Sequence, residues 1–591
     1  MLLFAGTLLS CAAERPLTPE IRPRGAEDGY VEALRAEHRA LARLRAELTW
    51  FEATRGEEAL ASPLEGPESL YAQSARTALD RAQRAPGLAA PDALALLFLR
   101  HALDRERVQM ATAALDAEAS TCEADGAVEV PFLARPISYR DAPLRLAQEA
   151  DPARRAQLQA AVSRFLAEKL NPILARKEQV AQAAARAAGY PDYVALSSAL
   201  REVDLDALLA EGAAYVRATE APFRATLDRV AREELGIPRE RLRASDFARL
   251  WRAPRLAAFF PRALELPALR FFLGGLGLSL RTAAGSEVLI DADATPRKRP
   301  RAFVEPVDAP ADVRLSVKPS GGLSDYWALF HEAGHAVHFA SANLAPEELR
   351  TLGYAAPAEA YGELFRSAFA DRSFLLRYRG FLAARGAPVP SDAQLAAILR
   401  HTALVEMMYL RRYAFAKIAW ELRLHGRPLA ELGPALALLP DAARVGGEGE
   451  DALRELYRQL FSVAAAVTLS SADAERFRVD VDDGFYAADY ARAFALAEML
   501  HDGLRRRFGD GWSHHPAAGA FLREQLFSAG MSLSPEQVAQ RLGYPPRVDF
   551  VAAAARAQRL LQAADALEHG TANPDPLELG PRLTASATLA P

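Results

Sequence analysis

Cysteine is scarce in this chain of 591 residues, which contains only Cys11 and Cys122. Two cysteines are too few for a disulfide framework or for a zinc site built from thiolates. The chain also lacks an excess of charge of either sign, because 71 basic residues oppose 76 acidic ones and the net charge is −5. Since proteins that bind nucleic acids present a strongly basic surface, we expect no nucleic-acid partner.

Long hydrophobic runs are lacking as well. The apolar run "MLLFAGTLLSC" at residues 1–11 is too short to span a bilayer, but it has the length of the apolar region of a secretory signal. Its end, "LLSC", resembles a bacterial lipobox, in which the cysteine is lipidated. We therefore predict a signal or lipoprotein segment at residues 1–20, a lipid anchor at Cys11, and a location on the periplasmic side of the cell envelope. The alternative is an unstructured tail on a cytoplasmic protein.

Alanine, leucine, arginine and glutamate dominate the rest of the chain, at spacings that predict helices. These helical regions cover about residues 30–115, 143–235 and 344–569. Between residues 286 and 319, short β-branched runs and many prolines predict two to four strands. We expect a mainly α fold with one small β-sheet, and a Pro-rich, disordered tail at residues 571–591.

Two local boundaries can be predicted within the helical regions. Asp151 and Pro152 are typical of a helix start, and Gly189 is typical of a helix end. The stretch "STCEADGAVEVPFL" at residues 120–133 interrupts the helical pattern and is predicted to form a loop.

The stretch "DYWALFHEAGHAVHFASA", residues 325–342, is a mostly apolar helical sequence that carries chemically active side chains. Residues four apart lie one turn above each other, so His331 and His335 project from one face and can bind one metal ion. Glu332 lies about 100° around the helix axis, close enough to hold a water at the metal. This is the H-E-x-x-H arrangement of zinc metalloproteases, with Glu332 as general base. The alternative is a pair of core histidines at this spacing.

A third ligand is expected from the helical stretch "YAAPAEAYGELFRSAF" at residues 354–369. Glu359 would complete a ligand set of two histidines and a glutamate, and Glu363, one turn later, would accept a hydrogen bond from a zinc-binding histidine. A solvated helix face is the alternative for both glutamates. His338, three residues after His335, is a candidate for a contact behind the ligands or for the cleft wall, or else a half-buried histidine with its own partner.

At these residues the sequence resembles the M3 family of zinc oligopeptidases, which includes thimet oligopeptidase and oligoendopeptidase F. "FHEAGHAVH" matches the extended zinc motif through Gly334 and His338, and Glu359 follows His335 by 24 residues, as in the family. The likeness runs more weakly from about Ile137 to Leu561. It implies two helical lobes around a deep substrate channel, a small sheet beside the zinc helix, and one Zn²⁺ per chain. We expect an N-terminal helical lobe at residues 21–200 and the catalytic region at residues 201–570.

The stretch "DGFYAADYARAFALAEML", residues 483–500, resembles the helix whose tyrosines line the cleft in this family. The resemblance implies that Tyr486 and Tyr490 assist the substrate and donate to the oxyanion. Aromatic packing is the alternative for both. Ala493 stands where thimet-type members carry a further tyrosine, and "RVDVDD" lacks their histidine, so oligoendopeptidase F is the better match.

The strand "DVRLSVKP", residues 312–319, is the candidate edge strand for pairing with a substrate backbone, followed by Gly321 and Gly322. The expected function is hydrolysis of internal bonds in short peptides by a zinc-activated water. Two alternatives remain: a carboxypeptidase-type zinc exopeptidase, and a catalytically silent envelope protein that binds peptides on the same scaffold.

Overall fold

The computed structural model describes residues 27–55, 68–295, 298–299, 301–447 and 449–571. The signal or lipoprotein segment predicted at residues 1–20, including Cys11, lies outside these residues, as does the predicted tail from residue 572 onward. None of the helices in the described ranges has the length and apolar content that a membrane span requires.

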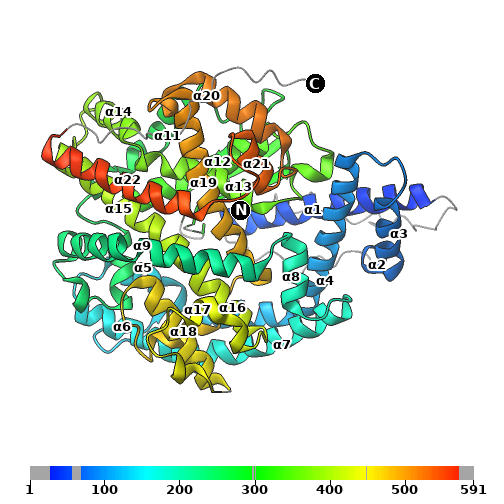
Figure 1. Ribbon diagram of the computed structural model, residues 1–591, viewed down its shortest axis with the longest axis horizontal. Helices are drawn as coiled ribbons and strands as arrows, with labels where there is room; N and C mark the ends of the chain where they lie inside the picture. Colours follow the sequence, from blue (N-terminus) through cyan, green and yellow to red (C-terminus); the bar gives the residue numbers. More distant parts are fainter. Residues whose placement is uncertain (1–26, 56–67, 296–297, 300, 448, 572–591) are drawn as a thin grey trace, which may run out of the picture.

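The fold is mainly α, as the sequence predicts (Figure 1). The first helices are α1 (Glu27–Arg55), α2 (Glu68–Tyr71), α3 (Gln73–Gln83), α4 (Ala90–Asp125), α5 (Ala142–Gln148), α6 (Pro152–Phe165), α7 (Asn171–Ala187) and α8 (Tyr193–Arg201). The later helices are α9 (Leu205–Leu235), α10 (Phe247–Trp251), α11 (Glu265–Gly275), α12 (Leu323–Ser341), α13 (Ala355–Arg366), α14 (Arg372–Ala383), α15 (Asp392–Leu410), α16 (Ile418–Leu424), α17 (Gly433–Leu436), α18 (Glu450–Ala465), α19 (Tyr486–Phe508), α20 (Pro516–Phe521), α21 (Pro535–Arg541) and α22 (Phe550–His569).

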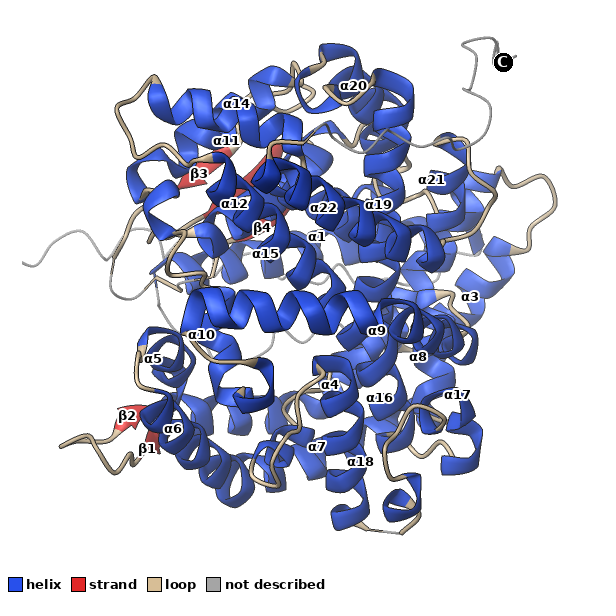
Figure 2. Ribbon diagram, turned by 60° about the vertical axis from the view of Figure 1, so that its left-hand side comes forward, coloured by secondary structure: helices blue, strands red, loops and turns tan. Residues whose placement is uncertain are grey.

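Two small sheets occur in the described part of the chain (Figure 2). One pairs β1 (Ala127–Val128) with β2 (Ile137–Ser138). The other, in the order β3-β5-β4, contains β3 (Leu289–Asp291), β4 (Phe303–Asp308) and β5 (Asp312–Ser316). Since β4 and β5 both contact α12, the predicted small sheet does lie beside the helix with the zinc motif.

The prediction that residues 312–319 form an edge strand is wrong. β5 is the central strand: Arg314 pairs with Leu289 of β3 on one side and with Glu305 of β4 on the other. Its backbone groups are therefore engaged within the sheet, and β4 is an edge. Strand order depends on tertiary pairing, which the sequence of one strand does not encode.

The largest apolar core extends from Val108 to Leu567 and includes most of α12. Leu329 and Phe330 are fully buried, whereas His331 and Glu332 beside them are half-buried. Burial of the apolar face thus fixes the helix and leaves its polar edge accessible. The division into lobes at residue 200 stays a prediction.

Candidate metal centre

Two glycines allow α12 and α13 to lie in close contact. A Cβ added at Gly334 would lie 2.5 Å from the backbone oxygen of Tyr361, and one at Gly362 would lie 2.8 Å from the ring of His331. Both distances are shorter than real Cβ contacts, so neither position accommodates a side chain without a shift of its surroundings. This close approach brings the α13 turn that carries Glu359 to the histidines of α12.

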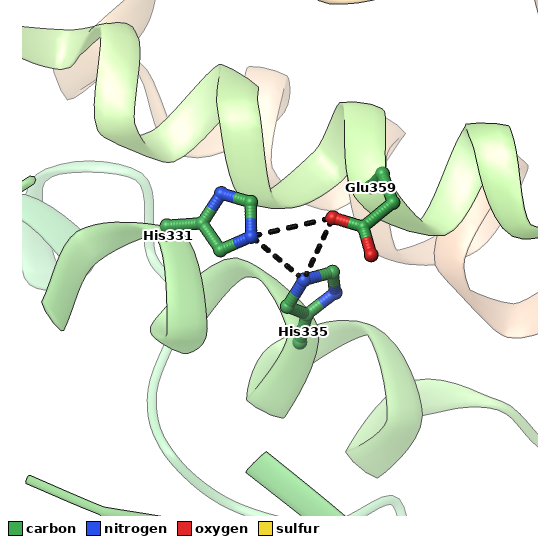
Figure 3. Close-up of side chains that lie close together, drawn as sticks. All are labelled: His331, His335 and Glu359. Atoms are coloured by element: carbon green, nitrogen blue, oxygen red, sulfur yellow. Dashed lines mark hydrogen bonds and ion pairs between the residues drawn. The ribbon is translucent and has the colours of Figure 1, made fainter. Parts of the chain in front are cut away.

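The three predicted ligands converge (Figure 3). The Nε2 atoms of His331 and His335 lie 3.0 Å apart. Glu359 Oε2 lies 3.4 Å from Nε2 of His331 and 3.6 Å from Nε2 of His335. The three atoms are two imidazole nitrogens from α12 and one carboxylate oxygen from α13, which is the arrangement that the sequence predicts.

These atoms fit a zinc ion. A tetrahedral zinc with bonds of about 2.0–2.1 Å holds its ligand atoms roughly 3.3 Å apart, and the separations here are 3.0, 3.4 and 3.6 Å. Glu359 Oε2 is buried and has no hydrogen-bond partner among the described residues. A buried carboxylate oxygen without a partner is costly, and coordination of a cation would satisfy it.

Glu363 fixes the orientation of one imidazole. Its Oε1 lies 2.9 Å from Nδ1 of His331, and its other oxygen is paired with Arg366. Donation from Nδ1 to Glu363 leaves the lone pair of Nε2 free for a metal. Burial alone would lower the pKa of His331, but the neighbouring carboxylates of Glu359 and Glu363 raise the pKa to about 10. The two carboxylates therefore make this position favourable for positive charge.

Glu332 stands next to His331 on α12 and is half-buried. Burial raises the pKa of its carboxyl group, and the neighbouring imidazoles of His335 and His331 oppose that rise. A carboxylate with a raised pKa is a better proton acceptor than one in water, which suits a general base.

The two tyrosines of α19 lie beside the ligands in different ways. The Tyr486 hydroxyl donates a hydrogen bond of 2.6 Å to Oε1 of Glu359, so it holds the carboxylate whose other oxygen faces the histidines. Tyr490 packs its ring against Tyr486, with centroids 4.9 Å apart, and against Tyr413 at 5.0 Å. Burial raises the pKa of both phenols, so both remain protonated donors at neutral pH.

His338 is not brought to the donor atoms. Its ring is fully buried, and its Nε2 lies 3.0 Å from the backbone oxygen of Gly530. Burial lowers its pKa to about 4, so the ring is neutral and Nε2 donates to that oxygen. His338 thus ties α12 to the segment before α21, with the rings of Tyr361 and Phe527 packed around it.

Arg366 and Gly362 are parts of this site that sequence reasoning missed. Arg366 follows Glu363 by three residues, a spacing that pairs side chains on a helix, so this signal was available. Gly362 carried no signal, because its role depends on where α12 lies.

A cavity of about 1140 Å³ adjoins the metal centre and shares Tyr486 with it. Its walls come from α1, α4, α7 and α8, from Glu305 of β4, and from the segment that begins at Thr351. It therefore lies between the first helices of the chain and the region that carries the ligands, where a substrate channel is expected.

A known structure shares this architecture. The crystal structure of a "putative oligoendopeptidase F" from Bacillus anthracis str. Ames matches with a TM-score of 0.55 and 12% sequence identity, over 90% of this chain and 90% of that one. The fold is like that of oligoendopeptidase F. No family model and no curated protein matches this chain. At this identity the likeness concerns the fold alone.

Proposed function

We propose that this protein is a zinc-dependent oligopeptidase that hydrolyses internal bonds of short peptides, with one Zn²⁺ per chain. The observation that carries the proposal is the convergence of His331, His335 and Glu359 within 3.0–3.6 Å, with a buried oxygen of Glu359 that has no hydrogen-bond partner among the described residues. Glu332 and a large cavity lie beside this convergence.

His331, His335 and Glu359 would hold the zinc ion, which when bound supplies an activated water and polarises the scissile carbonyl. Glu332 would accept the proton of the attacking water at its carboxylate and pass it to the nitrogen of the leaving amine. Glu363 would keep His331 in the tautomer that binds metal through Nε2.

Tyr490 is the better candidate to donate a proton to the developing oxyanion. The hydroxyl of Tyr486 is already engaged with Glu359 Oε1, at 2.6 Å. In this assignment Tyr486 holds the ligand carboxylate, and Tyr490 stabilises the charge that develops on the substrate oxygen.

The location in the cell envelope, through a lipid at Cys11, is proposed on the sequence alone. An exopeptidase and a silent peptide-binding protein remain the rival functions. The two carboxylates Glu332 and Glu359 favour an active enzyme, since a protein that only binds peptides has no need for a general base beside a set of metal ligands.

A peptide digestion tests the proposal. The zinc-loaded protein is incubated with a mixture of short peptides, with and without a chelator, and the products are mapped by mass spectrometry. We expect internal cleavage that the chelator abolishes and added zinc restores. Removal of terminal residues alone would indicate the exopeptidase, and peptide binding without products would indicate the silent protein.

A further inference from the structure

The charged side chains that line the large cavity are mostly paired with one another. Arg45 contacts Glu106 at 3.0 Å, and Lys177 contacts Asp116 at 2.7 Å. Arg201 pairs with Asp489, and Arg478 pairs with Glu178. These pairs cancel most of the charge of the wall, so they offer little to a charged ligand.

Arg105, on α4, is the exception among the cations of this wall. Its side chain is exposed, it lines the cavity, and it has no hydrogen bond or ion pair with any residue that the structure describes. The cavity wall around its guanidinium lowers the pKa by desolvation, while the side chain stays accessible to solvent. A guanidinium remains charged even so.

No residue that the structure describes supplies a counter-ion for Arg105. Glu106, the next residue on α4, is already held by His38, by Arg45 and by the hydroxyl of Tyr71. Arg201 carries the same charge as Arg105 and helps to lower its pKa, so it is no counter-ion. Arg201 itself pairs with Asp489, and its Cζ lies 4.8 Å from the ring centroid of Tyr486.

Two acids of the same cavity are also without an ion pair among the described residues, but neither neutralises Arg105. Burial raises the pKa of Glu305 to about 7, so this group carries only part of a charge at neutral pH. Glu123 lies eighteen residues further along the helix, which corresponds to about 27 Å.

We propose that Arg105 binds a carboxylate of the peptide substrate. The position supports this: Arg105 and Tyr486 line the same cavity, and the hydroxyl of Tyr486 holds Glu359. A peptide with its scissile bond at the metal centre extends into the cavity past Tyr486, where a guanidinium with two parallel N–H groups matches a carboxylate. The carboxylate belongs either to the free C-terminus of the peptide or to an acidic side chain. The inference rests on the proposed function, since it takes peptides as the ligand.

The test compares Arg105→Gln with Arg217→Gln. Arg217 is an exposed arginine on α9 that lies outside the cavity wall and has no hydrogen bond or ion pair in the described residues, so it is a matched control. Three labelled peptides of one sequence serve as probes: one with a free C-terminus, one with a C-terminal amide, and one amide in which a glutamate replaces a glutamine. Binding is measured by fluorescence anisotropy in the zinc-loaded Glu332→Gln background, and kcat/KM is measured with Glu332 intact.

We expect one carboxylate-bearing peptide to bind roughly 10- to 100-fold more tightly than the neutral amide, and Arg105→Gln to remove this preference while Arg217→Gln keeps it. A preference for the free C-terminus identifies the terminal carboxylate, and a preference for the glutamate peptide identifies the side chain. A preference that survives Arg105→Gln, or equal binding of all three peptides, would overturn the proposal. The binding measurement in the Glu332→Gln background needs no hydrolysis, so it tests the role of Arg105 alone. Failure of the protein with Glu332 intact to hydrolyse peptides would refute the proposed function separately.

Discussion

Two buried groups of charges in this molecule are balanced in different ways. In the Asp480 cluster, the carboxylate of Asp480 accepts hydrogen bonds from Arg412 and, at 2.9 Å, from the hydroxyl of Tyr457, while Lys417 Nζ lies 3.0 Å from its backbone oxygen. In the metal centre, Glu359 Oε2 faces two imidazole nitrogens at 3.4 and 3.6 Å and forms no hydrogen bond with a described residue.

The difference distinguishes a structural cluster from a binding site. The Asp480 cluster contains its own cations, so its electrostatic requirements are met when the chain folds. The metal centre gathers atoms that donate electron pairs, and a bound cation would satisfy them. Substitutions in the first cluster should therefore change stability, and substitutions in the second should change metal binding and catalysis.

The largest effect, a loss of catalytic rate, is expected from Glu332→Gln, which removes the proposed general base and leaves all three metal ligands in place. Glutamine keeps the shape but cannot accept the proton, so kcat should fall by roughly 10²- to 10⁴-fold while the zinc content stays unchanged. Steady-state kinetics with metal analysis of the same sample measures both. Turnover at the wild-type rate would refute Glu332 as the base.

Asp480→Ala tests the other half of the comparison. It leaves the buried Lys417 and the half-buried Arg412 without their shared carboxylate, so the free energy of unfolding should fall by about 3–5 kcal/mol, with the zinc content unchanged. Urea unfolding of the metal-free protein measures the change. Glu359→Gln is the counterpart: it should lower the zinc content and leave the free energy of unfolding of the metal-free protein little changed. Equal loss of zinc in both variants would contradict the distinction between a structural cluster and a binding site.

Gly334→Ala tests whether the close contact of α12 and α13 builds the site. Because the added Cβ would meet the backbone oxygen of Tyr361, the helices must move apart, at a cost of about 1–3 kcal/mol, and the zinc affinity should fall as well. Gly380→Ala is the control, since this exposed helical glycine has no heavy atom near its added Cβ, and it should leave zinc binding unchanged with stability equal or higher. If both variants bind zinc alike, the contact does not set the ligand positions.

Tyr486→Phe removes the hydrogen bond to Glu359 Oε1 and keeps the ring. The zinc affinity should fall roughly tenfold, or about 1.4 kcal/mol, because the carboxylate loses the contact that orients it. Competition with a chelator measures the affinity. An unchanged affinity would show that Glu359 is oriented without this hydroxyl.

The smallest effect is the acid sensitivity that Asp480 contributes. Burial alone would raise the pKa of Asp480, but Arg412 and Lys417 hold it below its usual range. Its stabilising contribution is therefore complete above about pH 4, the unfolded value, and is lost as the pH falls through the folded value. Below about pH 4, the stability of Asp480→Asn should depend less on pH than that of the wild type; parallel curves would exclude this contribution.

Local rules were enough to predict several of these features from the sequence. The helix period placed His331 and His335 on one face, and Asp151 does begin α6, since its carboxylate accepts hydrogen bonds from Ala153 and Arg154. Three strands lie where the sequence between residues 286 and 319 predicts two to four.

Features that depend on tertiary packing were not predictable. The loop predicted at residues 120–133 is partly wrong, because α4 continues to Asp125 with Cys122 packed against an apolar cluster, and packing outweighs weak propensity there. The central place of β5, the contact between Gly334 and Gly362, and the lack of an ion pair at Arg105 within the described ranges all follow from elements distant in sequence.

The most direct test of the metal centre is the zinc content of the purified protein after equilibration with zinc and dialysis, compared with that of His335→Ala. We expect one zinc per chain in the wild type and none in the variant. A wild-type protein without stoichiometric zinc, or a variant that retains as much as the wild type, would contradict the assignment of His331, His335 and Glu359 as ligands.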